Sequence, residues 1–363
     1  MDTKIFKEFE DLIQHQSDFI INNYGQPAYD ICCSVRDWFE TCLKHVRPLL
    51  EDENYTPLGL YLYMDIVAAD IFQKGAEKLF WNFLSGTTYK NKTVTHFFKN
   101  RKEASDDEHL KEVRAIFGAH PFQIGKVEKG NDRSHIGRVH YLGDSPRWLE
   151  FPTAIISRSD GRTESFSLDL DELKQFIIHR YGLLRHVTEK IQGDLKSFVE
   201  LMASTPIPIA ENMSPLEKLD ILYEEAGPNK RGKAGNGFQD EVQKLRNMFS
   251  TSVTSPKNQA MVDSYREALL PIIKKYRDCL QSMDFLNSWK EEPLLNAFSL
   301  GLPDNYSWDI QNIRIESSKS PIAENCLKSL FHSVFDTTYA SRKELYLLIC
   351  AHLFVHSGNN EKS

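Results

Sequence analysis

Residues 105–121 read SDDEHLKEVRAIFGAHP and indicate a short helix with a defined beginning and a defined end. The serine can cap the first turn, and the three acidic residues after it complement the positive end of the helix dipole. Apolar residues then recur at three- and four-residue steps, which is the spacing of one helix face. The helix must end near Gly118, because Pro121 disfavours helical geometry at His120. This stretch therefore predicts a helix that stops between two polar groups, Arg114 and His120.

The chain before this stretch has the same helical periodicity. Apolar residues recur at helical spacing in two segments between residues 5 and 46, and a strongly apolar segment runs from about residue 57 to residue 84. We expect this third segment at the centre of a first helical core. It contains Asp65 and Asp70, and a buried carboxylate needs a partner. One of the two could orient the guanidinium or the imidazole of the downstream stretch, or either could face solvent.

The chain after this stretch predicts a hairpin, a long helix and a second domain. Asp160-Gly161 lies between two β-prone runs and indicates a hairpin near residues 153–168. A long amphipathic helix follows, and prolines near residue 206 then break the periodicity. A single core stops growing at about 250 to 300 residues. We therefore predict a mainly α-helical protein, with a helical bundle over residues 1–205 that carries a small β-hairpin insertion, and an all-helical accessory domain over residues 206–363.

Composition narrows the class of protein. The 44 basic and 51 acidic residues give a formal net charge of −7, which argues against coating nucleic acid or anionic membrane by bulk charge. The N-terminus lacks the apolar block of a signal peptide, and no stretch approaches the roughly 20 apolar residues of a membrane span. The six cysteines are scattered without a C-x-x-C pair. We therefore expect a cytoplasmic protein with reduced thiols, no bound metal and no cofactor.

Arg114 and His120 form the pattern that carries chemistry. In a continuous helix they would lie about 120° apart around the axis, but a kink at Gly118 lets His120 fold back beside Arg114. Imidazole can move a proton at neutral pH, and a permanently charged guanidinium can hold a phosphate and offset charge in the transition state. RNA supplies its own nucleophile, the 2′-hydroxyl. The pair therefore predicts RNA cleavage without a metal ion.

At these residues the chain resembles the HEPN superfamily, the higher eukaryotes and prokaryotes nucleotide-binding domains. The signature of that family is an arginine followed after four to six residues by a histidine, late in an all-helical bundle, and Arg114 and His120 have five residues between them. The resemblance covers residues 1–200. It implies a metal-independent ribonuclease or RNA-binding domain, often a homodimer with the two pairs facing each other. It also implies a place in bacterial or antiviral defence or toxin systems, where a neutralising or regulatory protein is a possible partner.

Two features differ from the family pattern or leave its meaning open. Active members usually carry a polar residue directly after the arginine, whereas this chain has Ala115, and many such domains are inactive scaffolds. Arg114 could also be a solvated residue or the partner of a carboxylate, and His120 could simply cap the helix end. The rival hypothesis is therefore a non-catalytic helical protein that binds a partner protein or nucleic acid. It predicts Arg114 locked to a carboxylate such as Asp65 or Asp70, with no open groove. A weaker third possibility is a module that binds a mononucleotide.

Basic and aromatic residues follow the stretch and could contact an RNA substrate. Cationic groups able to hold phosphates alternate there with rings able to stack a base. The candidate substrate-binding residues are Arg133, His135, Arg138 and Arg158. The other interpretation is a solvated loop and hairpin whose acidic residues dilute the positive field.

Two further patterns lack the context that their chemistry needs. Residues 227–234 nearly spell a phosphate-binding loop, but Ala234 replaces the hydroxyl residue that would bind magnesium, so a flexible basic loop is expected there. His352 and His356 share a helix face and could hold a metal, although apolar neighbours favour a packing helix.

Overall fold

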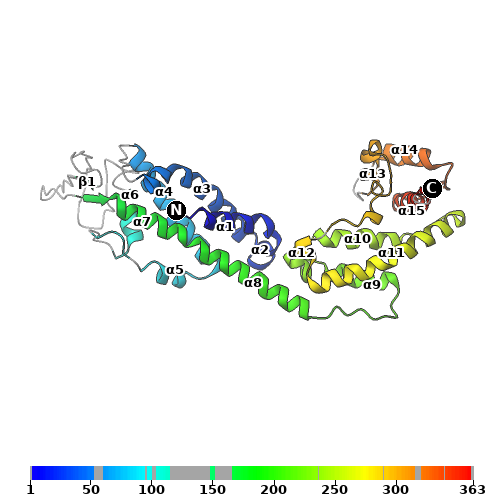
Figure 1. Cartoon of the computed structure of the whole chain (residues 1–363), viewed down its shortest axis with the longest axis horizontal. Coiled ribbons are helices and arrows are strands. Elements are labelled where there is room, and N and C mark those ends of the chain that lie inside the picture. Colours follow the sequence, from blue (N-terminus) through cyan, green and yellow to red (C-terminus); the bar gives the residue numbers. More distant parts are fainter. Residues whose placement is uncertain are drawn as a thin grey trace, which may run out of the picture. The chain divides into compact units, whose positions relative to one another are not determined.

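The computed structural model describes residues 2–52, 60–94, 96–99, 104–114, 148–151, 166–235, 237–288, 290–314, 320–338 and 340–360. Most of these residues are helical, which confirms the mainly α-helical prediction (Figure 1). The chain divides into two compact units, residues 1–194 and residues 195–363. This division falls within helix α8 (Leu184–Ser204), and the boundary expected after residue 205 follows the end of that helix.

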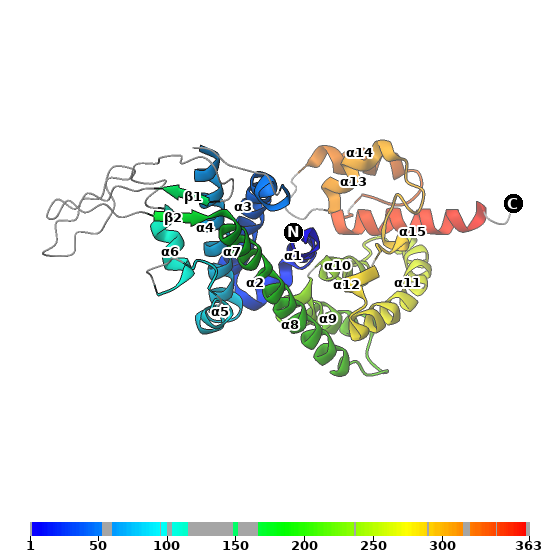
Figure 2. The same cartoon turned by 60° about the vertical axis from the view of Figure 1, so that its left-hand side comes forward.

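The first unit is built around helix α4. Its helices are α1 (Thr3–His15), α2 (Ser17–Tyr24), α3 (Gln26–Glu51), α4 (Leu60–Phe83), α5 (Gly86–Lys92), α6 (Asp106–Arg114), α7 (Leu170–Gly182) and the first part of α8. Helix α4 packs against α3, α5, α6 and α7 (Figures 1 and 2). The apolar segment predicted to form the centre of the core therefore does so.

Helices α3 and α4 approach each other closely. Phe39 and Phe72 are fully buried between them, with ring centroids 4.7 Å apart. A Cβ atom at Gly75 would lie 2.5 Å from Cε1 of Phe39, so glycine is required at this point of contact. The absence of a side chain at Gly75 thus leaves room for the buried Phe39 ring.

Two short strands pair in the first unit. Strand β1 (Trp148–Phe151) runs antiparallel to β2 (Phe166–Asp169), with Trp148 opposite Asp169 and Phe151 opposite Phe166 (Figure 2). Strand β2 leads directly into α7, whose first turn is capped by the Asp169 carboxylate. The predicted hairpin turn at residues 159–162 and the run 153–158 lie outside the described residues.

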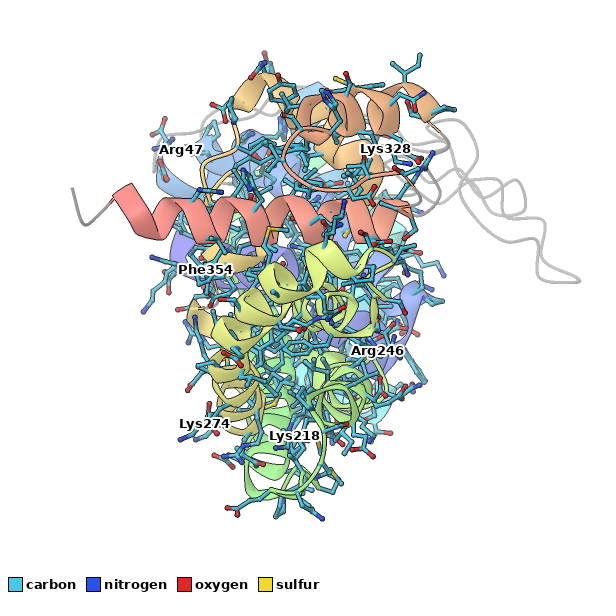
Figure 3. All side chains as sticks on the ribbon, turned by 90° about the vertical axis from the view of Figure 1, so that its right-hand side faces the viewer. Arg47, Lys218, Arg246, Lys274, Lys328 and Phe354 are labelled. Carbon is cyan, nitrogen blue, oxygen red and sulfur yellow. The ribbon has the colours of Figure 1, made fainter. Side chains whose placement is uncertain are left out.

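The second unit contains seven described α-helices besides the end of α8. They include α9 (Pro215–Glu225), α10 (Gly237–Ser250), α11 (Pro256–Ser282), α12 (Phe285–Ser288), α13 (Ser307–Arg314), α14 (Pro321–Phe331) and α15 (Arg342–Asn360), together with the 3-10 turns η2 (Arg231–Ala234), η3 (Pro293–Leu295) and η4 (Asp304–Tyr306). Helix α11 packs against α9, α10 and α15. Tyr265 of α11 contacts Phe354 of α15, which Figure 3 labels, with ring centroids 5.7 Å apart.

The segment that resembles a phosphate-binding loop is part of the core of the second unit, so the expectation of a flexible basic loop was wrong. Arg231 is 1% exposed, forms an ion pair with Glu225, and donates to the Met202 carbonyl oxygen at 2.8 Å. A Cβ atom at Gly232 would lie 1.9 Å from the Ala226 carbonyl oxygen. Arg231 thereby joins the end of α8 to the turn after α9.

One groove in the second unit has a cationic rim. It lies between α11 and the start of α9, has a volume of about 480 Å³, and includes Leu270, Lys218, Lys274 and Arg277. Lys218 and Lys274 can be followed in Figure 3.

Among the described helices of either unit, none combines the length and apolar character needed to cross a membrane.

Candidate functional site

Arg114 is the last residue of helix α6 that the structure describes. The helix begins as predicted, because the Ser105 hydroxyl accepts from the Glu108 amide at 3.2 Å and acidic residues occupy the first turn. The local sequence therefore stabilises the beginning of this helix, and Arg114 lies about two turns further along it.

A buried carboxylate holds Arg114. Its NH1 atom donates to Oδ2 of Asp70 at 2.6 Å, and Nζ of Lys74 lies 2.8 Å from the same oxygen. The side chain of Asp70 is 6% exposed, whereas that of Arg114 is 35% exposed. One carboxylate thus faces two cations, and the cluster has one excess positive charge at a partly open surface.

Asp65 lies apart from this cluster. It is fully buried, and its Oδ1 atom lies 3.5 Å from Nε2 of His45 on α3. The expectation that one of the two α4 carboxylates orients Arg114 is met by Asp70, and the alternative that either faces solvent is wrong. The two residues point to different neighbours because they are five positions apart on the helix.

The other predicted site residues fall outside the described part of the chain. They are the proposed acid/base residue His120 and the candidate substrate contacts Arg133, His135, Arg138 and Arg158. The geometry of the site is therefore that of Arg114 and its surroundings on α3, α4 and α6.

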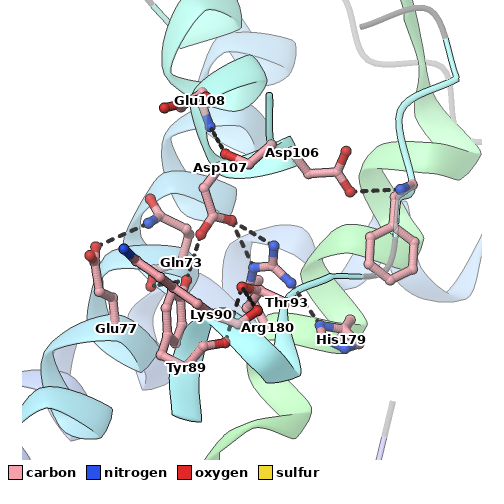
Figure 4. A network of polar contacts seen from close by, with 12 residues as sticks. Gln73, Glu77, Tyr89, Lys90, Thr93, Asp106, Asp107, Glu108, His179 and Arg180 are labelled. Carbon is pink, nitrogen blue, oxygen red and sulfur yellow. Dashed lines mark hydrogen bonds and ion pairs between the residues drawn. The ribbon is translucent and has the colours of Figure 1, made fainter. Parts of the chain in front are cut away.

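A polar network fixes α6 against the rest of the first unit (Figure 4). Arg180 of α7 is fully buried, and its Nε and NH2 atoms donate to Oδ1 of Asp107 at 3.0 and 2.6 Å. Tyr89 of α5 donates to the other carboxylate oxygen at 2.8 Å. In addition, the Asp106 carboxylate accepts from the Phe97 amide at 2.6 Å. Helix α6, and with it Arg114, is thereby tied to α5 and α7.

The same network sets the protonation of its neighbours. NH1 of Arg180 lies 2.8 Å from Nδ1 of His179, and because a guanidinium only donates, that nitrogen must accept. Burial and the nearby Arg180 charge lower the pKa of His179, although Asp107 and Asp106 oppose the shift. Burial, followed by the Asp107 charge, raises the pKa of Tyr89. Both side chains are therefore neutral members of the network near pH 7.

No local sequence pattern indicates this network. The sequence pattern marks Asp107 only as an acidic first-turn residue. Arg180 lies among the apolar positions of α7, and the single long helix expected after the hairpin is divided at Leu183 into α7 and α8. A lone arginine within an otherwise apolar stripe is the signal that could have been used, because a buried guanidinium needs a carboxylate.

An apolar groove adjoins the Arg114 cluster. It lies between α3 and α4 and has a volume of about 470 Å³. The residues that line it are Ile31, Ser34, Val35, Trp38, Phe39, Ile71, Lys74, Gly75 and Lys78. Trp38 is 56% exposed, and Lys74 is also the residue that shares Asp70 with Arg114. The rival hypothesis expected a locked arginine without an open groove, and the structure combines a paired arginine with a groove nearby.

Metal-binding geometry is not found in the part of the chain that the structure describes. No group of three or more histidine, cysteine, aspartate or glutamate side chains is placed there to hold an ion. His352 and His356 have ring centroids 4.2 Å apart on α15, and His352 contacts the rings of Phe331 and Phe335. His352 therefore packs against α14 and its C-terminal turn, whereas His356 is exposed beside it.

Comparison with family models, with curated proteins and with solved structures gives no match for this chain. The resemblance to the HEPN superfamily therefore stays a prediction.

Proposed function

We propose that the first unit is a metal-independent endoribonuclease of the HEPN type, in which Arg114 holds the phosphate and His120 moves the proton. The observation that carries the proposal is the geometry of Arg114, whose guanidinium is held by the buried Asp70 and is still about one-third exposed. A guanidinium has five N–H donors, so the bond to Asp70 leaves others for a phosphate. Arg114 is thus positioned and remains accessible.

The charge around Arg114 supports binding of an anion. Lys74 lies on the same carboxylate oxygen, so one negative charge is shared by two cations. Helix α6 is itself held by the buried Asp107–Arg180 pair, which limits the movement of its last residue. A fixed cation costs little reorganisation when charge develops on the phosphate in the transition state.

The proposed reaction uses the 2′-hydroxyl of the RNA. His120 accepts the proton of that hydroxyl while its oxygen attacks the adjacent phosphorus. The bond from phosphorus to the 5′-oxygen of the next nucleotide breaks, and this oxygen takes up a proton from a protonated group or from water. The products are a 2′,3′-cyclic phosphate and a free 5′-hydroxyl. Arg114 offsets the charge on the phosphoryl oxygens, and no metal ion or cofactor takes part.

Assembly and context are part of the same proposal. A homodimer would bring two Arg114–His120 pairs together, which is the arrangement that the family resemblance implies. A ribonuclease of a defence or toxin system would be held inactive by a neutralising or regulatory protein. The second unit, which is all-helical in its described residues, would serve as the accessory or oligomerisation domain.

Cleavage of a labelled RNA panel in EDTA tests the proposal. We expect the wild-type protein to cleave, and we expect Arg114→Ala and His120→Ala each to reduce kcat by about 100-fold or more. Arg185→Ala is the matched control, because Arg185 is an exposed arginine of the same unit that lies 3.4 Å from Asp2. Circular dichroism should be unchanged in all three variants, and thermal melting should be unchanged in His120→Ala and Arg185→Ala, whereas Arg114→Ala loses the ion pair with Asp70 and should melt at a lower temperature. Full activity of His120→Ala, or no cleavage with or without EDTA, would contradict the enzymatic proposal.

The non-catalytic alternative is favoured by one observation. The Arg114–Asp70 ion pair is a sufficient structural reason for an arginine at this position. If the chain binds RNA or a protein partner but the wild type and both variants leave RNA intact, the first unit is an interaction domain. Arg114→Ala would then lower stability without changing any turnover.

A further inference from the structure

We propose that the groove between α3 and α4 is a base-binding subsite for single-stranded RNA, in which Trp38 stacks on an unpaired base of the strand that Arg114 holds. This inference rests on the proposed function and adds its substrate class. It depends on three observations, which are the exposed tryptophan, the shape of the groove and the position of the neighbouring cations.

The groove has the size and surface of a site for a planar ring. Its volume of about 470 Å³ falls within the range of roughly 300 to 1,000 Å³ typical of small-molecule sites. Its floor contains the buried Phe39 and Val35, and its α3 wall carries Trp38. Tryptophan is a large, rigid side chain, so it can offer an exposed aromatic face at a small entropic cost. A base could therefore stack there in contact with apolar side chains.

The α4 wall supplies positive charge. Lys74 and Lys78 line the groove one helical turn apart, about 6 Å along the axis. Lys74 shares the Asp70 oxygen with Arg114, so the cations continue from the groove to the end of α6. On the α3 side, Asp37 is paired with Arg36 at 2.8 Å. A strand whose base stacks on Trp38 would thus have its phosphates along α4 towards Arg114.

These features favour RNA over an amphipathic helix as the occupant. An acidic helix could use the same apolar floor and the same lysines. However, the row of cations formed by Lys78, Lys74 and Arg114 extends beyond the apolar groove. A helix that fills only the groove would not contact Arg114. Stacking on aromatic rings together with cationic contacts to the backbone is the usual mode of single-strand binding.

Fluorescence binding tests the subsite without requiring cleavage. The probe is a 2′-O-methyl pyrimidine oligonucleotide, which lacks the nucleophile and cannot be cut by the proposed reaction. We expect it to quench the tryptophan emission of the wild type, and we expect Trp38→Phe to remove that quenching. Trp308→Phe is the matched control, because Trp308 is also about half exposed (55%) but lies on α13. This variant should be quenched by the oligonucleotide as the wild type is.

Affinity provides the second measurement. Loss of one base-stacking contact should raise the Kd of Trp38→Ala by about 5- to 150-fold. Lys78→Gln should weaken binding and reduce the slope of log K against log salt by about one. Because Trp38 is more than half exposed, both of its variants should fold, and circular dichroism checks this.

The outcomes separate this inference from the proposed function. If the oligonucleotide quenches Trp38 but no RNA is cut, the subsite stands and the endoribonuclease proposal fails. If RNA is cut while Trp38→Ala leaves KM and Kd unchanged, the enzyme stands and the subsite is refuted. If Trp38 emission changes with protein concentration alone and RNA has no effect on it, the groove binds a second copy of the chain and the inference is overturned.

Discussion

Replacing Asp107 with asparagine should destabilise the first unit, because it removes the charge that balances a buried arginine. Arg180 is fully buried, and the side chain of Asp107 is 19% exposed. Two Arg180 nitrogens bind one carboxylate oxygen, and the Tyr89 hydroxyl binds the other. The Asp107→Asn variant keeps the shape of the side chain but leaves the guanidinium without a negative partner.

The size of the effect follows from this burial. Removing one partner of a buried ion pair costs about 3 to 5 kcal/mol, and the lower end applies because the amide oxygen can still accept from Arg180. For a unit of this length, about 3 kcal/mol corresponds to a fall in Tm of roughly 6 to 12 °C. Asp278→Asn is the matched control, because its ion pair with Arg277 is exposed and should contribute less than about 1 kcal/mol.

Urea unfolding of the full chain, followed by circular dichroism, measures this cost. Hydrogen exchange in peptides from α6 and α7 should show that the loss of protection is centred on the network. In an Arg180→Met background the buried guanidinium that needs the Asp107 carboxylate is gone, so Asp107→Asn should cost much less there. A cost below about 1 kcal/mol, or an equal cost in both backgrounds, would show that the buried Asp107–Arg180 pair does not stabilise the first unit.

Two further predictions concern a histidine and two glycines. Burial and the Arg180 charge lower the pKa of His179 below the ordinary histidine value of about 6.5. As the pH falls through this value, the unfolded chain therefore binds the proton before the folded chain does. We expect the free energy of unfolding to fall from pH 7 to about pH 5. Urea unfolding at a series of pH values should show a weaker pH dependence of this free energy for His179→Gln than for the wild type. An identical pH dependence would argue against a neutral imidazole in the folded protein. Gly232→Ala should destabilise the second unit by about 1 to 3 kcal/mol, because its Cβ would meet the Ala226 carbonyl oxygen at 1.9 Å. A Cβ atom at Gly193 on helix α8 would have no neighbour within 4 Å, so Gly193→Ala should stabilise the helix by about 0.5 to 1 kcal/mol. Calorimetry should therefore show a lower unfolding midpoint for Gly232→Ala and a higher one for Gly193→Ala.

The helical part of the fold could be predicted because its signals are local. The acidic first turn after Ser105 predicted the start of α6, and the apolar segment near residues 57–84 predicted the central helix α4. Both depend on residues within a few turns of one another, where the 3.6-residue period and the capping groups act directly. The apolar neighbours of Asp70 in the sequence also predicted that this carboxylate would need a partner.

Several features depended on packing between distant segments. Asp107 and Arg180 are 73 residues apart in the chain, and no local pattern pairs them. The basic segment around Arg231 resembles a flexible loop in the sequence. Its burial could not be predicted locally, because it depends on contacts with Glu225 and with the end of α8. Trp38 lies in one of the apolar segments between residues 5 and 46, which would favour burial, yet it is more than half exposed at the groove between α3 and α4.

The order of residues along the chain was enough to predict a mainly helical protein, to locate its central helices, and to place Arg114 on a helix that begins at a Ser105 cap. Tertiary structure alone decided that Asp70 holds this arginine, that Asp107 and Arg180 fix its helix, and that Lys74 connects it to a groove. The physical reason is one of range. Helix formation is governed by hydrogen bonds and side chains within a few residues, whereas a charge in the core is stabilised by whichever opposite charge the folded chain brings beside it.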